Sequence, residues 1–265
     1  MANRARLWIA AALTLAACGT GPGNAAPAAP PVEPPAVTSP AVIPAQKATE
    51  AATEAATATP ITYPAQGKDA WLIAPAESDP PAGHAGRLFR YRVAVEKGIV
   101  GLAPADFAKA VQTTLADPHG WTAGGRWRFQ RVGPGRPYDF TVYLATPVTR
   151  DRLCDDNGDG YTSCRNGKSV VLNVARWVKG VPGFAGAGLP VYRQYMVNHE
   201  VGHRLGNGHE LCPGQGDLAP VMQQQTLGLH GCRPNPWPYP DGHSYHGRSG
   251  VYDDKTPRRD EGKLS

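Results

Sequence analysis

Residues 199–209 of the chain read H-E-V-G-H-R-L-G-N-G-H. Side chains four residues apart lie on one face of an α-helix, so His199 and His203 are expected to point toward one metal ion. Gly206 has no Cβ and can adopt a positive φ, which would end the helix and turn the chain back. His209 would then supply a third ligand from beyond the turn. The stretch therefore predicts a helix that ends at a three-histidine metal site.

The same stretch places a general base beside the predicted metal site. Three protein ligands leave a fourth position open for water, which is typical of a catalytic zinc site and not of a structural one. Glu200 lies about 100° around the helix from His199, where it can reach that water without acting as a ligand. We therefore expect one Zn²⁺ per chain, bound by the three histidines, with Glu200 as the catalytic base.

The first residues have the features of an export signal. A short basic segment, residues 1–6, precedes an apolar run of eleven residues at 7–17, which is too short to span a bilayer as a helix. The run ends in Leu-Ala-Ala before Cys18, and this resembles the lipobox of bacterial lipoproteins, whose cysteine carries the lipids. We predict a lipoprotein signal peptide at 1–17, lipidation of Cys18 and a lipid-anchored place outside the cytoplasm. An ordinary secretory signal is the alternative.

The other four cysteines indicate disulfides. Cys154, Cys164, Cys212 and Cys232 form an even number in an exported chain, which implies two disulfides with three possible connectivities. Proximity in the sequence favours the pairs 154–164 and 212–232. The competing interpretation, a four-cysteine zinc site, lacks the usual C-x₂-C spacing.

Composition divides the exported chain into three parts. Residues 18–66 are rich in Ala, Pro and Thr with almost no aromatic residues, so they are expected to form a disordered tether. Residues 243–265 are polar and charged and are expected to form a flexible tail. The residues between them, 67–242, are numerous enough for one domain with one core.

Charge argues against one class of partner. The net charge is +5, and it falls to +3 once Arg4 and Arg6 leave with the signal, because 25 basic and 22 acidic residues remain. No run of Lys and Arg, and no alternation of basic and aromatic residues, indicates a nucleic acid partner. The expected partners are a peptide or protein substrate and, through the lipid anchor, the membrane. A monomer is expected.

Hydrophobic periodicity predicts four strands and two helices in the domain. We expect strands at residues 88–95, 127–132, 140–145 and 169–174, and helices at residues 104–116 and 190–205. Pro104 and Pro190 suit the first turn of a helix, where their missing N–H has no partner to lose. The strand at 169–174 is expected to be the sheet edge that pairs with an extended peptide.

The motif at residues 199–209, together with Met222, resembles the metzincin clan of zinc peptidases. The chain resembles more closely a group of zincin-like secreted domains from actinobacteria whose function is unknown. The matching stretches are residues 170–173, 192–195, 198–203 and 220–228, and the resemblance covers roughly residues 85–240.

This resemblance implies an α/β (α+β) zincin fold. A mixed twisted sheet and an active-site helix would form one half, above an irregular, disulfide-stapled C-terminal half. The resemblance also implies that Met222 forms a Met-turn, in which the thioether packs beneath the zinc site and holds the ligand geometry. A methionine that fills a gap in the core is the alternative. The implied ligands and base are His199, His203, His209 and Glu200.

A second motif raises the question of calcium. Asp155, Asn157 and Asp159 fit the start of a calcium-binding loop. However, the twelfth loop position is Asn166, where such a loop needs a bidentate Glu. A polar loop closed by a disulfide explains the pattern as well, so Ca²⁺ is not expected here.

Together these features predict a cell-surface zinc-dependent endopeptidase. Glu200 would take a proton from the water at the zinc ion and pass it to the leaving amine. One alternative is a zinc-containing binding or structural domain of the cell envelope without turnover. Another is a peptidase of cell-wall cross-links. The presence of Glu200 argues against the first alternative, since a purely structural zinc has no use for a base.

Overall fold

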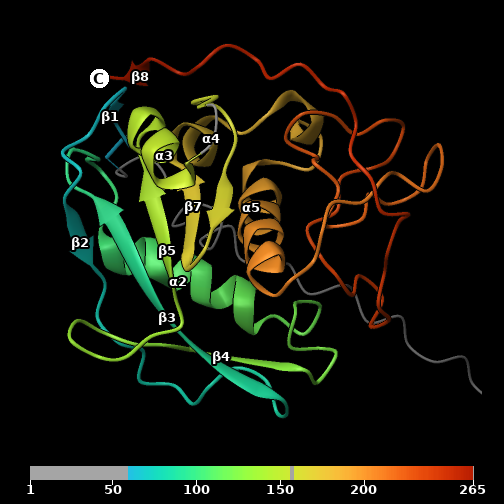
Figure 1. The fold of residues 1–265 in the computed structure, drawn as a ribbon, viewed down its shortest axis with the longest axis horizontal. Coiled ribbons are helices and arrows are strands. Elements are labelled where there is room, and N and C mark those ends of the chain that lie inside the picture. Colours follow the sequence, from blue (N-terminus) through green and yellow to red (C-terminus); the bar gives the residue numbers. More distant parts are fainter. Residues whose placement is uncertain (1–58, 156–157, 265) are drawn as a thin grey trace, which may run out of the picture. The chain divides into compact units, whose positions relative to one another are not determined.

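A mixed sheet of six strands organises the computed structural model, which describes residues 59–155 and 158–264 (Figure 1). The strand order is β2-β3-β5-β7-β6, and β4 pairs with the first half of β3. Strands β3, β4, β5 and β7 are parallel, whereas β2 and β6 run antiparallel to their neighbours at the two ends. The bounds are β2 Trp71–Ile73, β3 Arg87–Glu96, β4 Trp127–Arg131, β5 Phe140–Ala145, β6 Cys164–Asn166 and β7 Ser169–Asn173.

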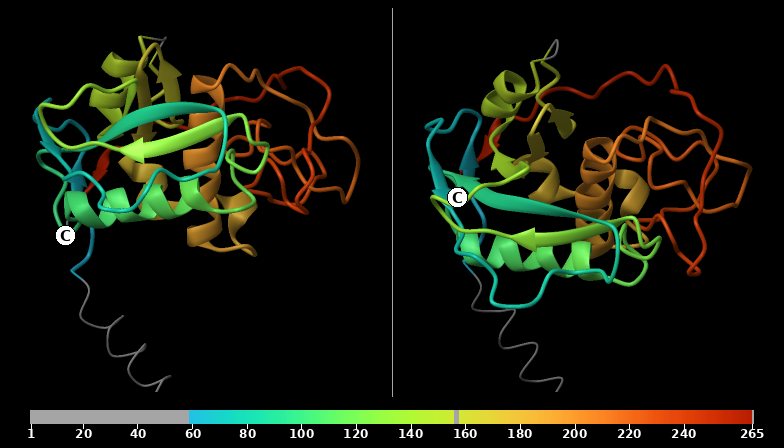
Figure 2. Two further views of the ribbon diagram at one scale, coloured as in Figure 1. Left: turned by 90° about the horizontal axis from the view of Figure 1, so that it is seen from below. Right: turned by 60° about the horizontal axis from the view of Figure 1, so that its bottom comes forward.

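Two long helices cover one face of this sheet. Helix α2 (Pro104–Ala116) packs against β3 and against α5 (Leu189–Arg204), which in turn packs against β7. Figure 2 shows α2 beneath the strands and α5 beside them. The buried side of α2 carries apolar residues three or four positions apart, as a helix on a core requires: Phe107, Ala108, Val111 and Leu115. The main core therefore lies between the sheet and these two helices.

Three short elements lie between β5 and α5 in the sequence and complete the part of the domain that contains the sheet. They are α3 (Pro147–Cys154), α4 (Val174–Lys179) and the 3₁₀ turn η1 (Pro182–Phe184). Successive residues of β7 face opposite sides of the sheet: Val170 and Leu172 join the main core, whereas Val171 packs in a second cluster with Cys154 of α3. Helix α3 thus covers the face of the sheet opposite to α2 and α5. Because both faces of β7 are buried, its sequence reads as an apolar run and not as an alternation.

The predicted mixed α and β architecture is confirmed, and one strand assignment is wrong. The helix predicted at 104–116 and the strand at 140–145 have the observed bounds of α2 and β5. However, residues 169–174 do not form the sheet edge, because β6 pairs with the outer side of β7. The strand also ends at Asn173, whose side chain accepts a hydrogen bond from the backbone N–H of Ala175 and so caps α4.

Within the described residues, two disulfides staple the fold, and both pairings are those predicted. Cys154 is bonded to Cys164, which closes the loop between α3 and β6. Cys212 is bonded to Cys232 in the part that follows α5. From Leu205 to Glu261 the chain forms no helix or strand, in agreement with the irregular C-terminal half that we expected. None of the described helices is long and apolar enough to cross a membrane.

The end of the chain lies along the domain, which differs from the flexible tail expected at 243–265. Strand β8 (Gly262–Lys263) pairs with β1 (Tyr63–Pro64), so the domain predicted at 67–242 gains residues on both sides. Figure 1 shows this last segment crossing from the irregular half to β1. The polar residue Asp260 is buried there between Arg176 and Lys179, so polarity in this segment reflects paired charges as well as exposure. The predicted signal peptide at 1–17, the predicted lipidation site Cys18 and residues 19–58 of the predicted tether lie outside the described residues.

Candidate metal centre

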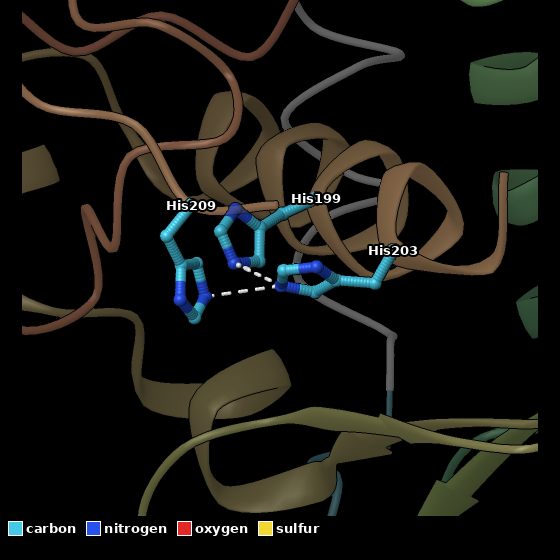
Figure 3. Close-up of side chains that lie close together, drawn as sticks. All are labelled: His199, His203 and His209. Atoms are coloured by element: carbon cyan, nitrogen blue, oxygen red, sulfur yellow. Dashed lines mark hydrogen bonds between the residues drawn. The ribbon is translucent and has the colours of Figure 1, made fainter. Parts of the chain in front are cut away.

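Three histidine side chains converge at the end of α5. Helical spacing places His199 and His203 one turn apart, and Gly206, with φ +99°, turns the chain back toward His209. The Nε2 atom of His203 lies 3.2 Å from Nε2 of His199 and 3.0 Å from Nε2 of His209 (Figure 3). The prediction from the sequence that these three side chains converge is confirmed.

In His199 and His203, the second ring nitrogen, Nδ1, forms a hydrogen bond with a backbone carbonyl oxygen. His199 Nδ1 lies 2.8 Å from the carbonyl oxygen of Val221, and His203 Nδ1 lies 2.9 Å from that of Asn207. A carbonyl oxygen can only accept, so both Nδ1 atoms carry the proton. In a neutral imidazole this leaves the lone pair on Nε2, and these are the atoms that meet. The two backbone carbonyls therefore orient both rings as metal ligands.

The surroundings of the histidines favour their neutral form. Burial lowers the pKa of His199 well below its usual value of 6.5, and the neighbouring His203 and His209 lower it further. Burial, followed by His203, lowers the pKa of His209 to about 4. Metal ions bind neutral imidazole, so these side chains are ready to act as ligands at neutral pH without losing a proton first.

The spacing of the nitrogens fits a first-row metal ion. A tetrahedral ion with metal–nitrogen distances of about 2.0–2.1 Å separates two ligand nitrogens by roughly 3.3 Å. The distances of 3.2 and 3.0 Å are close to this value. In residues 59–155 and 158–264, His199, His203 and His209 are the only group of three His, Cys, Asp or Glu side chains with ligand atoms close enough to hold an ion.

Glu200 presents a buried carboxyl group to the same site. Its side chain is 5% exposed, and its Oε2 atom has no hydrogen-bond partner among the described residues. Burial raises its pKa to about 8, although the charge of Arg150 opposes this shift. A carboxyl group with a pKa near neutrality can both accept and release a proton, which is the property of a general base.

Met222 packs beneath the helix turn that carries the first two histidines. It is 1% exposed, and a Cβ added to Gly202 would collide with its Sδ atom and lie 2.7 Å from Trp121 Cζ2. The following residue is tied to the same helix, because Tyr195 Oη donates a hydrogen bond to the carbonyl oxygen of Gln223 at 2.9 Å. Met222 thus packs directly against Gly202, and only glycine fits at position 202.

The sequence of the domain matches one family of proteins. Residues 58–240 match the family described as "Protein of unknown function (DUF3152)". The chain belongs to the DUF3152 family. No curated protein and no solved structure shows a significant match to it. The matched range includes all three histidines, Glu200 and Met222, and it ends before the segment that forms β8.

The three-histidine site of this DUF3152 domain lies in a cleft of about 520 Å³. The cleft is lined by residues 162–165, which include the start of β6, and by Gln224, Thr226 and Leu227. The histidines and Glu200 also line it. The cleft is deep enough to hold several atoms of a ligand next to the three Nε2 atoms.

Sequence reasoning missed several residues of the cleft. Arg150 belongs to α3, a helix that we did not predict, and nothing in the local sequence distinguishes it from a surface arginine. Arg165 directly follows Cys164, so the disulfide could have indicated its fixed position. Tyr195 precedes His199 by one helical turn and shares its stripe, which is a usable signal.

The calcium-loop candidate Asp159 lines the same cleft as the histidines, but its carboxylate is engaged by neighbouring residues. Asp159 accepts hydrogen bonds from the backbone N–H groups of Tyr161 and Thr162 and forms an ion pair with Arg150. Its predicted calcium partner Asn157 lies outside the described residues, and Asp155 ends α3 with a positive φ of 51°. Outside the group of three histidines, His230 contacts Asp254 at 2.8 Å, and His246 contacts Glu210 at 3.2 Å.

Proposed function

We propose that the protein is a zinc-dependent endopeptidase that acts outside the cytoplasm. One observation carries this proposal: three neutral imidazoles converge on one point in a cleft that also contains the unpartnered carboxyl oxygen of Glu200. A three-ligand site leaves a position open for substrate, and a general base beside it is the combination that hydrolysis requires.

The chemistry divides between ion and protein. When bound, zinc acts as a Lewis acid toward the scissile carbonyl group and makes water more acidic. The carboxylate of Glu200 accepts the proton of the attacking water at Oε2 and delivers it to the nitrogen of the leaving amine, so that the carboxylate is regenerated. Val221 and Asn207 keep the rings of His199 and His203 in place through their carbonyl oxygens.

The cleft suits an extended peptide. Strand β6 is the last strand of the sheet, so one of its edges has backbone groups that no other described strand uses. Residues 162–165, at the start of β6, line the cleft beside the histidines. A substrate that pairs with this edge would bring a backbone carbonyl group next to the metal centre. The edge strand for substrate is thus β6 and not the strand at 169–174.

Two features support a place outside the cytoplasm. The disulfides Cys154–Cys164 and Cys212–Cys232 are of a kind that persists in oxidising compartments. The segment before Cys18 has the composition of an export signal with a lipobox. We therefore include a lipid anchor at Cys18 in the proposal, and incorporation of labelled fatty acid into wild type but not into Cys18→Ala would test it.

The Glu200→Ala variant tests the enzymatic role. The full chain, loaded with zinc, is incubated with a peptide library and with cell-wall peptide fragments. Glu200→Ala should keep zinc and fold but lose hydrolysis by about 10²–10⁴-fold, because only proton transfer is removed. Glu261→Ala is a matched control, since that carboxylate is exposed and does not line the cleft.

The result distinguishes the alternatives. Cleavage of cell-wall fragments alone would identify a cross-link peptidase. If wild type hydrolyses no substrate faster than Glu200→Ala, the enzyme proposal fails. A zinc-containing binding domain would then account for the three histidines.

A further inference from the structure

One cation in the cleft is fixed beside the metal centre. Arg165 lies on the edge strand β6, and its side chain lines the cleft. Its Nη2 atom donates a hydrogen bond to the carbonyl oxygen of His203 at 3.1 Å, at the C-terminal end of α5. The guanidinium is therefore held close to the second histidine, although the residue as a whole is exposed to solvent.

The other charges of the cleft are already balanced. Arg150 lies 3.0 Å from Asp151 and 3.4 Å from Asp159. Asp159 also accepts hydrogen bonds from two backbone N–H groups and from the hydroxyl of Thr162, so its acceptor positions are largely used. Glu200 is the proposed base.

Arg165, by contrast, is not paired in this way, although its charge acts at longer range on the carboxyl group of Glu200. In the described part of the chain no carboxylate forms an ion pair with it. Gln224, Thr226 and Leu227 also line the cleft, and none of them is charged. A guanidinium has five N–H donors in a planar fork, and Arg165 forms one hydrogen bond to the residues that the structure describes. The remaining donors of Arg165 can therefore bind an anionic group of a ligand in the cleft.

We propose that Arg165 selects peptides that carry a carboxylate next to the bond that is cleaved, an inference that rests on the proposed peptidase function. Arginine and carboxylate form two parallel N–H···O bonds, which give geometric selectivity as well as attraction. The carboxylate can belong to an Asp or Glu side chain or to the free C-terminus of the substrate. Arg165 acts on binding and orientation and takes no part in proton transfer.

Peptide binding tests this inference without turnover. Zinc-loaded full-length Glu200→Ala protein is titrated with pairs of hexapeptides that differ only by Glu or Gln at one position, scanned along the peptide. At one position the Glu peptide should bind about five- to tenfold more tightly. In the Arg165→Gln background this ratio should fall to about one, and Arg165→Lys should restore part of it.

The matched control is Lys168→Gln, which removes a positive charge from the same β6–β7 hairpin but does not line the cleft. It should leave the Glu/Gln ratio unchanged. Zinc content and melting temperature of each variant show whether loss of the Arg165–His203 hydrogen bond has disturbed the site. A ratio of one at every position in the Arg165 protein, or an unchanged ratio in Arg165→Gln, would overturn the inference.

Amidation of the peptide C-terminus identifies the source of the carboxylate. If amidation removes the preference and the Glu/Gln exchange does not, the ligand of Arg165 is the terminal carboxylate. Hydrolysis by the protein with Glu200 intact separates the two proposals. Turnover without a preference for carboxylate refutes the role of Arg165 alone, whereas a carboxylate preference in binding without any turnover refutes the peptidase function alone. If no peptide binds, both proposals fail.

Discussion

The carbonyl oxygen of Val221 accepts a hydrogen bond from Nδ1 of His199 at 2.8 Å. This contact joins the irregular C-terminal half to the helix that supplies two of the three converging nitrogens. The next residue, Met222, packs against Gly202 on the same helix. The position of the histidines therefore depends on a segment with no regular structure, which is itself held by the Cys212–Cys232 disulfide.

Removal of one histidine should abolish stoichiometric metal binding. We expect wild type to bind one zinc ion per chain and His203→Ala to lose most of it, because two remaining protein ligands make a poor site. His243→Ala is the control, since its side chain is 90% exposed and lies outside the group of three. Metal analysis after dialysis measures the effect. Full zinc occupancy in His203→Ala would show that the ion binds elsewhere.

The contact between Gly202 and Met222 predicts unequal effects of two small changes. Gly202→Ala adds a methyl group where Met222 and Trp121 leave no space, so it should lower the free energy of unfolding by about 1–3 kcal/mol and displace the histidines on either side. Met222→Leu nearly conserves volume and should cost less than about 1.5 kcal/mol while zinc is retained. Denaturant unfolding and zinc affinity test both variants. The prediction is wrong if Met222→Leu loses zinc while Gly202→Ala keeps it.

The parts of the fold that were predictable are those with a local signal. The period of apolar residues identifies α2 and α5, and the spacing from His199 to His209 predicts that the three histidines converge, without any knowledge of the rest of the chain. Met222 required the resemblance to metzincins, since one methionine in an irregular segment has no pattern of its own. Proximity in sequence was enough for the disulfides.

The parts that were not predictable depend on contacts between distant residues. Strand β6 has three residues and contains two polar side chains, so no alternation reveals it, and without it β7 becomes the apparent edge. The contact of Arg165 with His203 and the burial of Asp260 likewise depend on segments that meet only in the folded protein. From composition alone, the last residues were expected to form an exposed, flexible tail. The partners of Asp260, Arg176 and Lys179, lie more than eighty positions earlier in the chain and cannot be inferred from the local sequence.

Asp260 should make stability depend on acid pH. Burial alone would raise its pKa, but hydrogen bonds from Lys179 and the Gly262 N–H, with the charges of Lys179 and Arg176, lower it below 3.8. A carboxyl group whose pKa is lowered by folding stabilises the fold fully above the unfolded value of about 3.9, and this contribution disappears as the pH falls through the folded value. Asp260→Asn should thus destabilise by on the order of 3 kcal/mol at pH 7 and by less below about pH 4.

Unfolding curves of wild type and Asp260→Asn between pH 2 and 7 measure this effect. Asp253→Asn serves as the control, because that residue is exposed and no ion pair to it is present in the described residues. A difference between wild type and Asp260→Asn that stays constant over the whole range would contradict the prediction.

Removal of the C-terminal segment should weaken both the fold and the metal centre. The backbone N–H of Gly250 donates a hydrogen bond to the carbonyl oxygen of His209 at 3.1 Å, so the segment contacts the third ligand directly. Tyr252 stacks on His230 with ring centroids 3.4 Å apart and accepts a hydrogen bond from the N–H of Cys212. Deletion of residues 243–265 also removes β8 from β1.

For this deletion we expect a lower melting temperature and a zinc affinity reduced by about tenfold, because contacts that orient a ligand typically contribute this much. A protein shortened only by residues 264–265 is the control, since it keeps all of these contacts. Equal melting temperatures and zinc affinities in the two truncated proteins would show that the segment has no part in holding the site.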